Sequence, residues 1–189
     1  MEIAASILQM DKKKPYIFID RDDTLIYDVP YLNDPEKARL TPGAGRTLAM
    51  LREKGFGIIV ISNQSGVGRG IITMEQLNAV FARIKEMLLA EGCVLDDIFF
   101  CPHTPADNCK CRKPRTGMLE QACAKHAVDL QRSAMVGDSK ADIEMGRAFK
   151  LRTVQIRLPG LNKADANADF TADSLENAYG YLCGLLEGK

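Results

Sequence analysis

The stretch Ile17–Leu25 limits what this chain can fold into more than any other, because an apolar run ends abruptly in three acids and a threonine. The run Ile17–Ile19 has the character of a buried strand. Its acids should lie at the carboxyl end of that strand, since an unpaired carboxylate is costly to bury and open α/β sheets bind ligands at that edge. Asp20 and Asp22 are two positions apart and point to the same side of an extended chain. Two like charges so close favour a bound cation or a shared proton.

The composition is that of a globular protein without an excess of either charge. The 189 residues are 46% hydrophobic and 26% charged, and 25 basic residues balance 25 acidic ones. We therefore expect a single domain over residues 1–189, with no nucleic acid and no membrane as its partner.

Lys12–Lys14 follow a short apolar start, which reverses the charge order of a secretory signal. We expect a cytoplasmic protein, and a monomer because no long amphipathic stripe is left over.

Strand-like and helix-like segments alternate along the chain, as in a parallel sheet with helices on both faces. Strands are expected at residues 16–20, 56–61, 98–100, 134–136 and 153–156. Helices are expected to begin near Pro42, Thr73, Thr116, Asp142 and Ser174. Loops are expected at residues 26–40, 63–70, 101–115 and 158–169. No connection leaves room for a large inserted lid, so we predict a three-layer α/β fold without a cap domain.

Polar side chains follow three of the expected strands at the points where they end. Asp138 and Asp142 follow the strand at 134–136, and Ser62 follows the strand at 56–61. Because the carboxyl ends of parallel strands share one edge, these groups can meet Asp20 and Asp22. Several carboxylates in one cleft form a hard oxygen site suited to Mg²⁺. The alternative is that Asp138 and Asp142 only cap the start of a helix.

A second metal site is indicated by a short polar loop. Three of the six cysteines surround one histidine there: Cys101, His103, Cys109 and Cys111. Three thiolates and one imidazole are the ligand set of a closed structural zinc site. The alternative is a set of buried thiols without metal, although this loop has little core in which to bury them. The other cysteines are expected to be packing residues: Cys93, Cys123 and Cys183.

Four motifs, in this order, resemble the haloacid dehalogenase phosphohydrolase superfamily. They are Asp20–Leu25, Ser62–Asn63, Lys113 and Gly137–Asp142. The resemblance covers residues 16 to about 156 and implies the Rossmann-like haloacid dehalogenase fold. Within the superfamily, Cys101–His103, Cys109–Pro114 and Ser62–Gly66 are similar to the D-glycero-D-manno-heptose 1,7-bisphosphate 7-phosphatases. The same segments are similar to the histidinol-phosphate phosphatase domain.

The resemblance implies a role for each motif. Asp20 would attack phosphorus and form an aspartyl-phosphate, and Asp22 would act as acid and then as base. Mg²⁺ would be held by Asp20, by the backbone carbonyl of Asp22 and by Asp138. Ser62 and Lys113 would hold the phosphoryl oxygens, where charge builds up during transfer. A surface lysine is the plainer alternative for Lys113.

Loops around the strand ends are expected to bind a small-molecule phosphosugar. The candidate contacts are Asp28, Val29, Pro30, Tyr31, Ser62, Asn63, Gln64, Ser65, Arg69, Arg112 and Lys113. Arg69 could meet a second phosphate or could be an ordinary exposed arginine. The glycine-rich segment Gly66–Gly70 lacks the spacing of a dinucleotide-binding loop, so we interpret it as a substrate loop.

Three positions depart from the relatives that the motifs resemble. Asp23 stands where glycine is usual, Ser62 replaces a threonine, and Ser139 stands where a lysine is frequent. The loop with Pro30-Tyr31 and Asp34-Pro35 and the turn Gly68–Gly70 look more like the heptose enzymes, whereas the short metal loop Thr104–Asn108 looks more like the histidinol-phosphate relative. A third hypothesis is a zinc-stabilised protein that binds phosphosugars without turning them over.

Overall fold

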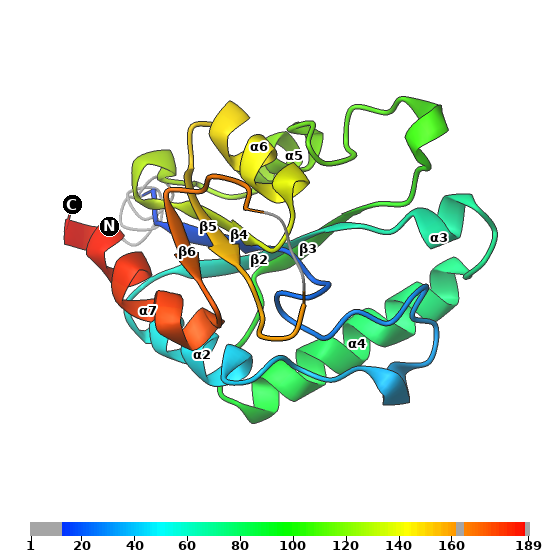
Figure 1. Cartoon of the computed structure of the whole chain (residues 1–189), viewed down its shortest axis with the longest axis horizontal. Helices are drawn as coiled ribbons and strands as arrows, with labels where there is room; N and C mark the ends of the chain where they lie inside the picture. The colour runs from blue at the N-terminus through cyan, green and yellow to red at the C-terminus, as the bar shows by residue number, and fades with distance from the viewer. Residues whose placement is uncertain (1–12, 162–164, 188–189) are drawn as a thin grey trace, which may run out of the picture.

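A central parallel sheet organises the computed structural model, which describes residues 13–161 and 165–187. The apolar start of the chain and Lys12 lie outside these described residues. All neighbouring strands are parallel, in the order β3-β2-β1-β4-β5-β6. The strands are β1 (Tyr16–Ile19), β2 (Gly57–Asn63), β3 (Asp97–Cys101), β4 (Ala134–Gly137), β5 (Arg152–Ile156) and β6 (Phe170–Ala172). Figure 1 shows the sheet between two layers of helices, which confirms the predicted three-layer α/β fold.

The helices divide between the two faces of the sheet (Figure 1). They are α2 (Ala44–Glu53), α3 (Ser65–Gly68), α4 (Met74–Ala90), α5 (Gly117–Lys125), α6 (Lys140–Ala148) and α7 (Leu175–Gly184). Single 3-10 turns lie at Pro35–Lys37, Pro105–Asp107, Leu130–Arg132 and Leu185–Glu187. The larger apolar core lies between the sheet and α2, α4 and α7, and the smaller one lies between the sheet and α5 and α6.

β1 is buried on both faces because it lies in the middle of the sheet. Ile17 and Ile19 belong to the core on the α2/α4/α7 side, whereas Tyr16 and Phe18 belong to the core on the α5/α6 side. This accounts for an apolar run without polar alternation. The backbone N–H of Asp20 donates to the carbonyl of Val136 at 2.8 Å and extends the ladder by one residue. The acids that follow β1 are thereby fixed at the centre of the carboxyl edge.

Most of the expected elements are confirmed, and the exceptions are short. The capping box between Thr73 and Gln76 is present at the start of α4, with both hydrogen bonds made. Pro42 lies before α2, since Gly43 takes a left-handed conformation with a φ of 70° and the helix begins after it. The segment expected as a loop at 63–70 contains α3. The segment expected as a loop at 158–169 is followed by a short strand, β6, that was not expected.

No helix in the described part of the chain is long and apolar enough to cross a membrane. The connection between β1 and α2 is a loop with one 3-10 turn, and that between β3 and β4 holds only the cysteine loop, α5 and another turn. Neither carries an inserted lid. The loops at the carboxyl edge of the sheet must therefore shape whatever site lies there.

Candidate active site

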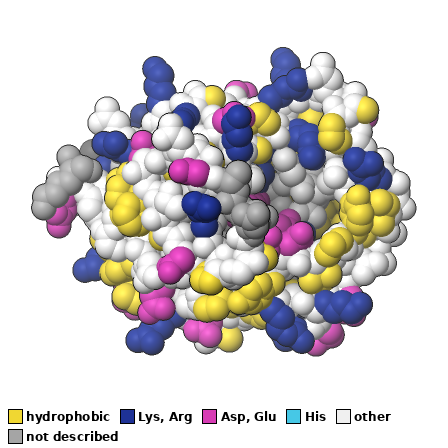
Figure 2. All heavy atoms as spheres, in the orientation of Figure 1, with side chains coloured by type: hydrophobic (Ala, Val, Ile, Leu, Met, Phe, Trp, Pro, Cys, Tyr) yellow, Lys and Arg dark blue, Asp and Glu magenta, His cyan; other side chains and the backbone are white. Residues whose placement is uncertain are grey.

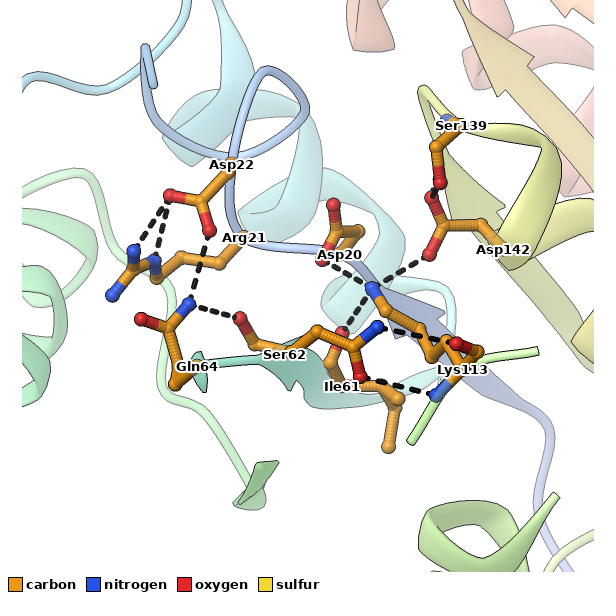
Figure 3. Close-up of polar contacts among 10 residues, drawn as sticks. Asp20, Arg21, Asp22, Ile61, Ser62, Gln64, Lys113, Ser139 and Asp142 are labelled. Atoms are coloured by element: carbon orange, nitrogen blue, oxygen red, sulfur yellow. Dashed lines mark hydrogen bonds and ion pairs between the residues drawn. The ribbon is translucent and has the colours of Figure 1, made fainter. Parts of the chain in front are cut away.

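Lys113 reaches the end of β1 and contacts two acids from distant parts of the chain (Figure 3). Its Nζ lies 2.5 Å from Asp20 Oδ1 and 2.6 Å from Asp142 Oδ1, and it donates to the carbonyl of Ile61 at 3.0 Å. The lysine side chain is 3% exposed, the Asp20 side chain 9% and the Asp142 side chain 0%. The sequence predicted that Asp20 and Asp142 would meet at this edge, and the structure joins Lys113 to them in one buried cluster.

The electrostatics of this cluster follow from burial and from charge pairing. Burial raises the pKa of Asp20 well above its ordinary value, and the charge of Lys113 opposes this shift. Burial alone would lower the pKa of Lys113. The negative charges of Asp142 and Asp20 outweigh that effect, so the pKa of Lys113 stays above its usual range. The charged form of the lysine is thus favoured by the two acidic side chains between which its amine lies.

Three buried acids could hold a cation at the same place. Carboxylate oxygens of Asp20, Asp138 and Asp142 all lie within 4.8 Å of one another. Lys113 balances one of these three charges, so a divalent cation fits the remainder in both charge and ligand type. The backbone carbonyl of Asp138 is fixed by a hydrogen bond from Gln155 Nε2 at 2.9 Å. Of the expected magnesium ligands, Asp20 and Asp138 lie together, whereas the carboxylate of Asp22 belongs to another group.

The Asp22 carboxylate is held from two sides. Its Oδ1 accepts hydrogen bonds from Arg21 Nε at 2.9 Å and from Arg21 Nη2 at 2.7 Å. Its Oδ2 accepts one from Gln64 Nε2 at 3.0 Å. The same amide nitrogen donates to Ser62 Oγ at 2.7 Å, so one network joins Asp22 to Ser62 (Figure 3). Ser62 is fully buried at the end of β2.

Asn63 fixes the backbone that carries Lys113. Its Oδ1 accepts from the backbone N–H of Lys113 at 3.0 Å, and its Nδ2 donates to the Lys113 carbonyl at 3.3 Å. A side-chain amide that pairs with both backbone groups of one residue fixes its position as a neighbouring strand would. The carboxyl end of β2 thereby holds the lysine loop in register with the sheet.

The cysteine loop forms the second predicted cluster. The four ligand atoms of Cys101, His103, Cys109 and Cys111 all lie within 4.8 Å of one another. Cys101 Sγ lies 3.5 Å from Cys109 Sγ and 3.2 Å from Cys111 Sγ, and His103 Nδ1 lies 3.3 Å from Cys111 Sγ. Sulfur atoms around a tetrahedral zinc lie about 3.8 Å apart. The donors and their spacing therefore fit zinc, and the loop has few apolar contacts that could order it otherwise.

A cleft of about 300 Å³ opens beside Asp22. Asp28, Pro30, Tyr31, Asn63, Gln64 and Ser65 line it, together with Arg21, Asp22 and Gly66. Figure 2 shows acidic side chains in a hollow near the centre of one face, with lysine and arginine side chains around it. Most of the expected substrate contacts thus share one cleft.

Five expected substrate contacts do not line this cleft. Ser62 is fully buried at the end of β2. Val29 packs against the larger core, and Arg69 is exposed at the end of α3. Arg112 Nη1 donates to the carbonyl of His103 at 3.4 Å. Together with Lys113 it lines a separate hollow of about 320 Å³ on the cysteine loop. The Lys113 amine itself points inward to Asp20.

Asp23 occupies a position that usually needs glycine. Its φ is 51°, in the left-handed region that Asp tolerates better than most residues. Its Oδ1 accepts a hydrogen bond from the backbone N–H of Asp28 at 2.9 Å. The side chain thereby connects the loop after β1 to Asp28 at the start of the cleft wall. Asp23 is not one of the three acids that could hold a cation.

Two features of the site were missed from the sequence. Arg21 is 2% exposed and pairs with Asp22, although a lone arginine between acids reads as a surface residue. Asp142 was expected near the site but not as a direct partner of Lys113. Its place four residues after Asp138, in the first turn of α6, was the available signal.

Known proteins resemble this chain over most of its length. The HAD-hydrolase-like family model matches residues 110–178. A D-glycero-beta-D-manno-heptose-1,7-bisphosphate 7-phosphatase from Yersinia pestis is 34% identical over 176 residues, which are 88% of this chain and 94% of the relative. A histidine biosynthesis bifunctional protein from Legionella pneumophila is 39% identical over 134 residues, 69% of this chain but 38% of that protein.

A solved structure extends the similarity to the fold. The D,D-heptose 1,7-bisphosphate phosphatase from B. bronchiseptica, complexed with magnesium and phosphate, superposes with a TM-score of 0.80 at 27% sequence identity. The match covers 90% of this chain and 98% of that one. The similarity therefore extends over most of the fold.

Proposed function

We propose that this chain, which belongs to the haloacid dehalogenase family of phosphatases that includes the heptose-1,7-bisphosphate 7-phosphatases, removes the 7-phosphate of D-glycero-D-manno-heptose 1,7-bisphosphate. One observation carries the proposal: Asp20, Lys113 and Asp142 form a buried cluster at the carboxyl edge of the sheet. The cleft beside Asp22 gives a sugar room to lie next to that cluster.

The residues at the end of β1 divide the reaction between them. Asp20 attacks the phosphorus atom, a new P–O bond forms to its carboxylate, and the bond to the sugar oxygen breaks. Asp22 delivers its proton to that leaving oxygen. Asp22 then takes a proton from the water that hydrolyses the aspartyl-phosphate, which restores both carboxyl groups and releases phosphate. Lys113 supports this role of Asp20, because its charge opposes the rise in the Asp20 pKa that burial causes.

Charge on the transferred phosphoryl group needs donors around it. We propose that Ser62 from β2 and Lys113 from the cysteine loop would hold its oxygens. We propose that Asp20, Asp138 and the backbone carbonyl of Asp22 would hold Mg²⁺, with Asp142 beside them. When bound, the ion would reduce the repulsion between the anionic nucleophile and the anionic substrate.

Histidinol phosphate is the second candidate substrate. The short cysteine loop favours it, and the similarity to a histidine biosynthesis protein from Legionella pneumophila supports it. The loop Asp28–Tyr31, which lines the cleft through Asp28, Pro30 and Tyr31, favours the heptose substrate instead. We therefore rank the heptose bisphosphate first.

We propose a cytoplasmic location for the enzyme. All six cysteines are free thiols, and four metal-binding groups cluster in one loop. Thiols of this kind persist in a reducing compartment. Zinc bound to this loop would keep its three thiolates from oxidation.

Phosphate release with Mg²⁺ tests the proposal. The panel contains heptose 1,7-bisphosphate, histidinol phosphate and several hexose phosphates, with the enzyme at equal concentration. We expect the highest kcat/KM for the heptose bisphosphate, with phosphate released from position 7. Faster release from histidinol phosphate would favour the second candidate. If no substrate releases phosphate, both proposed phosphatase activities are contradicted, and a non-catalytic protein that binds phosphosugars is favoured.

A further inference from the structure

Gln64 lies between two groups that take part in the proposed reaction. It follows β2 and is 5% exposed. Its Nε2 donates to Asp22 Oδ2 at 3.0 Å and to Ser62 Oγ at 2.7 Å. Asp22 is the acid and base of the proposed reaction, and Ser62 binds the phosphoryl group. A single amide nitrogen therefore contacts both (Figure 3).

The two hydrogen bonds determine how each partner is presented. An amide nitrogen has two hydrogens, and both are used here. Because Ser62 Oγ accepts one of them, its own hydroxyl hydrogen remains to donate to a phosphoryl oxygen. Asp22 has its Oδ2 fixed by Gln64 and its Oδ1 fixed by Arg21. The plane of the carboxylate is thus set by contacts on both oxygens.

Gln64 is itself held in place. Its backbone N–H donates to the carbonyl of Cys101 at 2.7 Å, so its main chain follows the start of the cysteine loop. The next turn, α3, begins at Ser65 and fixes the chain on the other side. The amide is therefore a rigid link between the acid, the serine and the loop that carries Lys113.

We propose that Gln64 is a positioning residue, which aligns protonation of the leaving group by Asp22 with binding of the phosphoryl group by Ser62. This inference rests on the proposed phosphatase function and adds a specific role for the glutamine. Gln64 acts through the two side chains and not as an acid, base or nucleophile. Its loss misaligns Asp22 most, because Asp22 is the partner with the more exposed side chain, at 25%.

The first test compares substrates with different leaving groups. A sugar oxygen needs a proton as it leaves, whereas p-nitrophenolate does not. We expect Gln64→Ala to lower kcat/KM for the sugar phosphate by about 100-fold, within the range of general acid catalysis. For p-nitrophenyl phosphate we expect a loss of about tenfold or less, which reflects Ser62 alone. An equal loss with both substrates, or no loss, would overturn the proposal.

Gln64→Glu tests the same role with the side-chain volume retained. The change replaces the donor with a carboxylate that repels Asp22, so we expect a loss at least as large as that of Gln64→Ala. Gln76→Glu is the matched control, because the Gln76 side chain accepts a hydrogen bond from the Thr73 N–H and does not line the cleft. We expect wild-type activity from the control. Unfolding midpoints show that each variant is folded before its rates are compared.

A double-mutant cycle separates positioning from a general structural role. If Gln64 acts through Asp22, Gln64→Ala should cost less than about tenfold in an Asp22→Ala background. The same 100-fold loss in both backgrounds would overturn the proposal, because it would show that Gln64 acts independently of Asp22. If wild-type protein is active but Gln64→Ala causes the same loss in both backgrounds, the role of Gln64 is contradicted and the proposed function is not. Wild-type protein that is inactive on every substrate would contradict both.

Discussion

Asp23 shows how one residue can satisfy two demands at once. The backbone turns there with a φ of 51°, and the side chain accepts a hydrogen bond from the N–H of Asp28. Glycine would satisfy the first demand only. The carboxylate of Asp23 satisfies the second demand, because its partner Asp28 lines the cleft.

The role of Asp23 predicts a difference between two substitutions. Asp23→Asn keeps an acceptor and tolerates the left-handed backbone, so we expect stability within about 0.5 kcal/mol of wild type. Asp23→Ala loses the acceptor and adds backbone strain, and we expect it to lower the free energy of unfolding by about 2 kcal/mol. Urea denaturation of both variants measures this. Equal stability of the two variants would show that the hydrogen bond to Asp28 contributes nothing.

For single residues, the sequence predicted which side chains belong to the site better than it predicted which neighbours they contact. Asp20, Asp138 and Asp142 could be predicted because parallel strands end at one edge, whereas Lys113 was indicated by the resemblance to the family. The Arg21–Asp22 pair and the amide of Gln64 could not, because which neighbour a side chain contacts depends on its rotamer and on the packing around it. Such contacts leave no periodic signal in the chain.

Asp96 joins several elements just before β3. Its Oδ1 accepts from Lys14 Nζ at 3.0 Å, and its Oδ2 accepts from Arg52 Nη1 at 2.7 Å and from Ile58 N at 2.8 Å. Burial would raise the pKa of Asp96, but these hydrogen bonds and charges outweigh it and lower the pKa. One carboxylate thus links the start of β1, the end of α2 and the start of β2.

The lowered pKa of Asp96 predicts a pH-dependent contribution to stability. The contribution is fully present above the ordinary carboxyl pKa and is lost as the pH falls through the lower folded-state pKa. We expect Asp96→Asn to reduce the free energy of unfolding by about 1–3 kcal/mol at pH 7, and the difference to shrink below about pH 4. Denaturation at several pH values tests this. Glu86→Gln, at an exposed pair on α4, should change little at any pH, and a constant difference for Asp96→Asn would contradict the assignment.

The cysteine loop predicts a dependence of activity on zinc. Lys113 lies two residues after Cys111, so a loop that loses its metal should also lose the position of the lysine. We expect one zinc ion per chain by elemental analysis, and loss of both zinc and activity on chelation or in Cys109→Ser. Cys183→Ser, at a half-buried position on α7, should keep both. Protein without zinc after purification in the absence of chelators would contradict the site.

Among the elements, long periodic segments could be predicted and short ones could not. The capping box of α4 and the apolar runs of β1 and β2 carry strong local signals. The single turn α3 and the three-residue strand β6 have none, because tertiary contacts decide them. Thr116 precedes α5 as expected, but its hydroxyl donates to Glu120 Oε1 at 2.7 Å instead of capping the backbone.

For the whole molecule, the strand order explains why distant motifs meet. β1 lies between β2 and β4, so the residues after all three strands converge at the middle of one edge. Alternation of strands and helices predicts a parallel sheet but not its strand order. The order emerges only from packing, and it is what brings Asp20, Ser62 and Asp138 into one site.

Asp20 should become phosphorylated during turnover if it is the nucleophile. Acid quenching of the enzyme shortly after mixing with heptose 1,7-bisphosphate and Mg²⁺, followed by mass spectrometry of its peptides, tests this most directly. We expect the added mass of one phosphoryl group on the peptide that contains Asp20, and its absence in a folded Asp20→Asn variant that has lost turnover. Phosphate release by wild-type enzyme with the label on another residue, or full activity of Asp20→Asn, would contradict it.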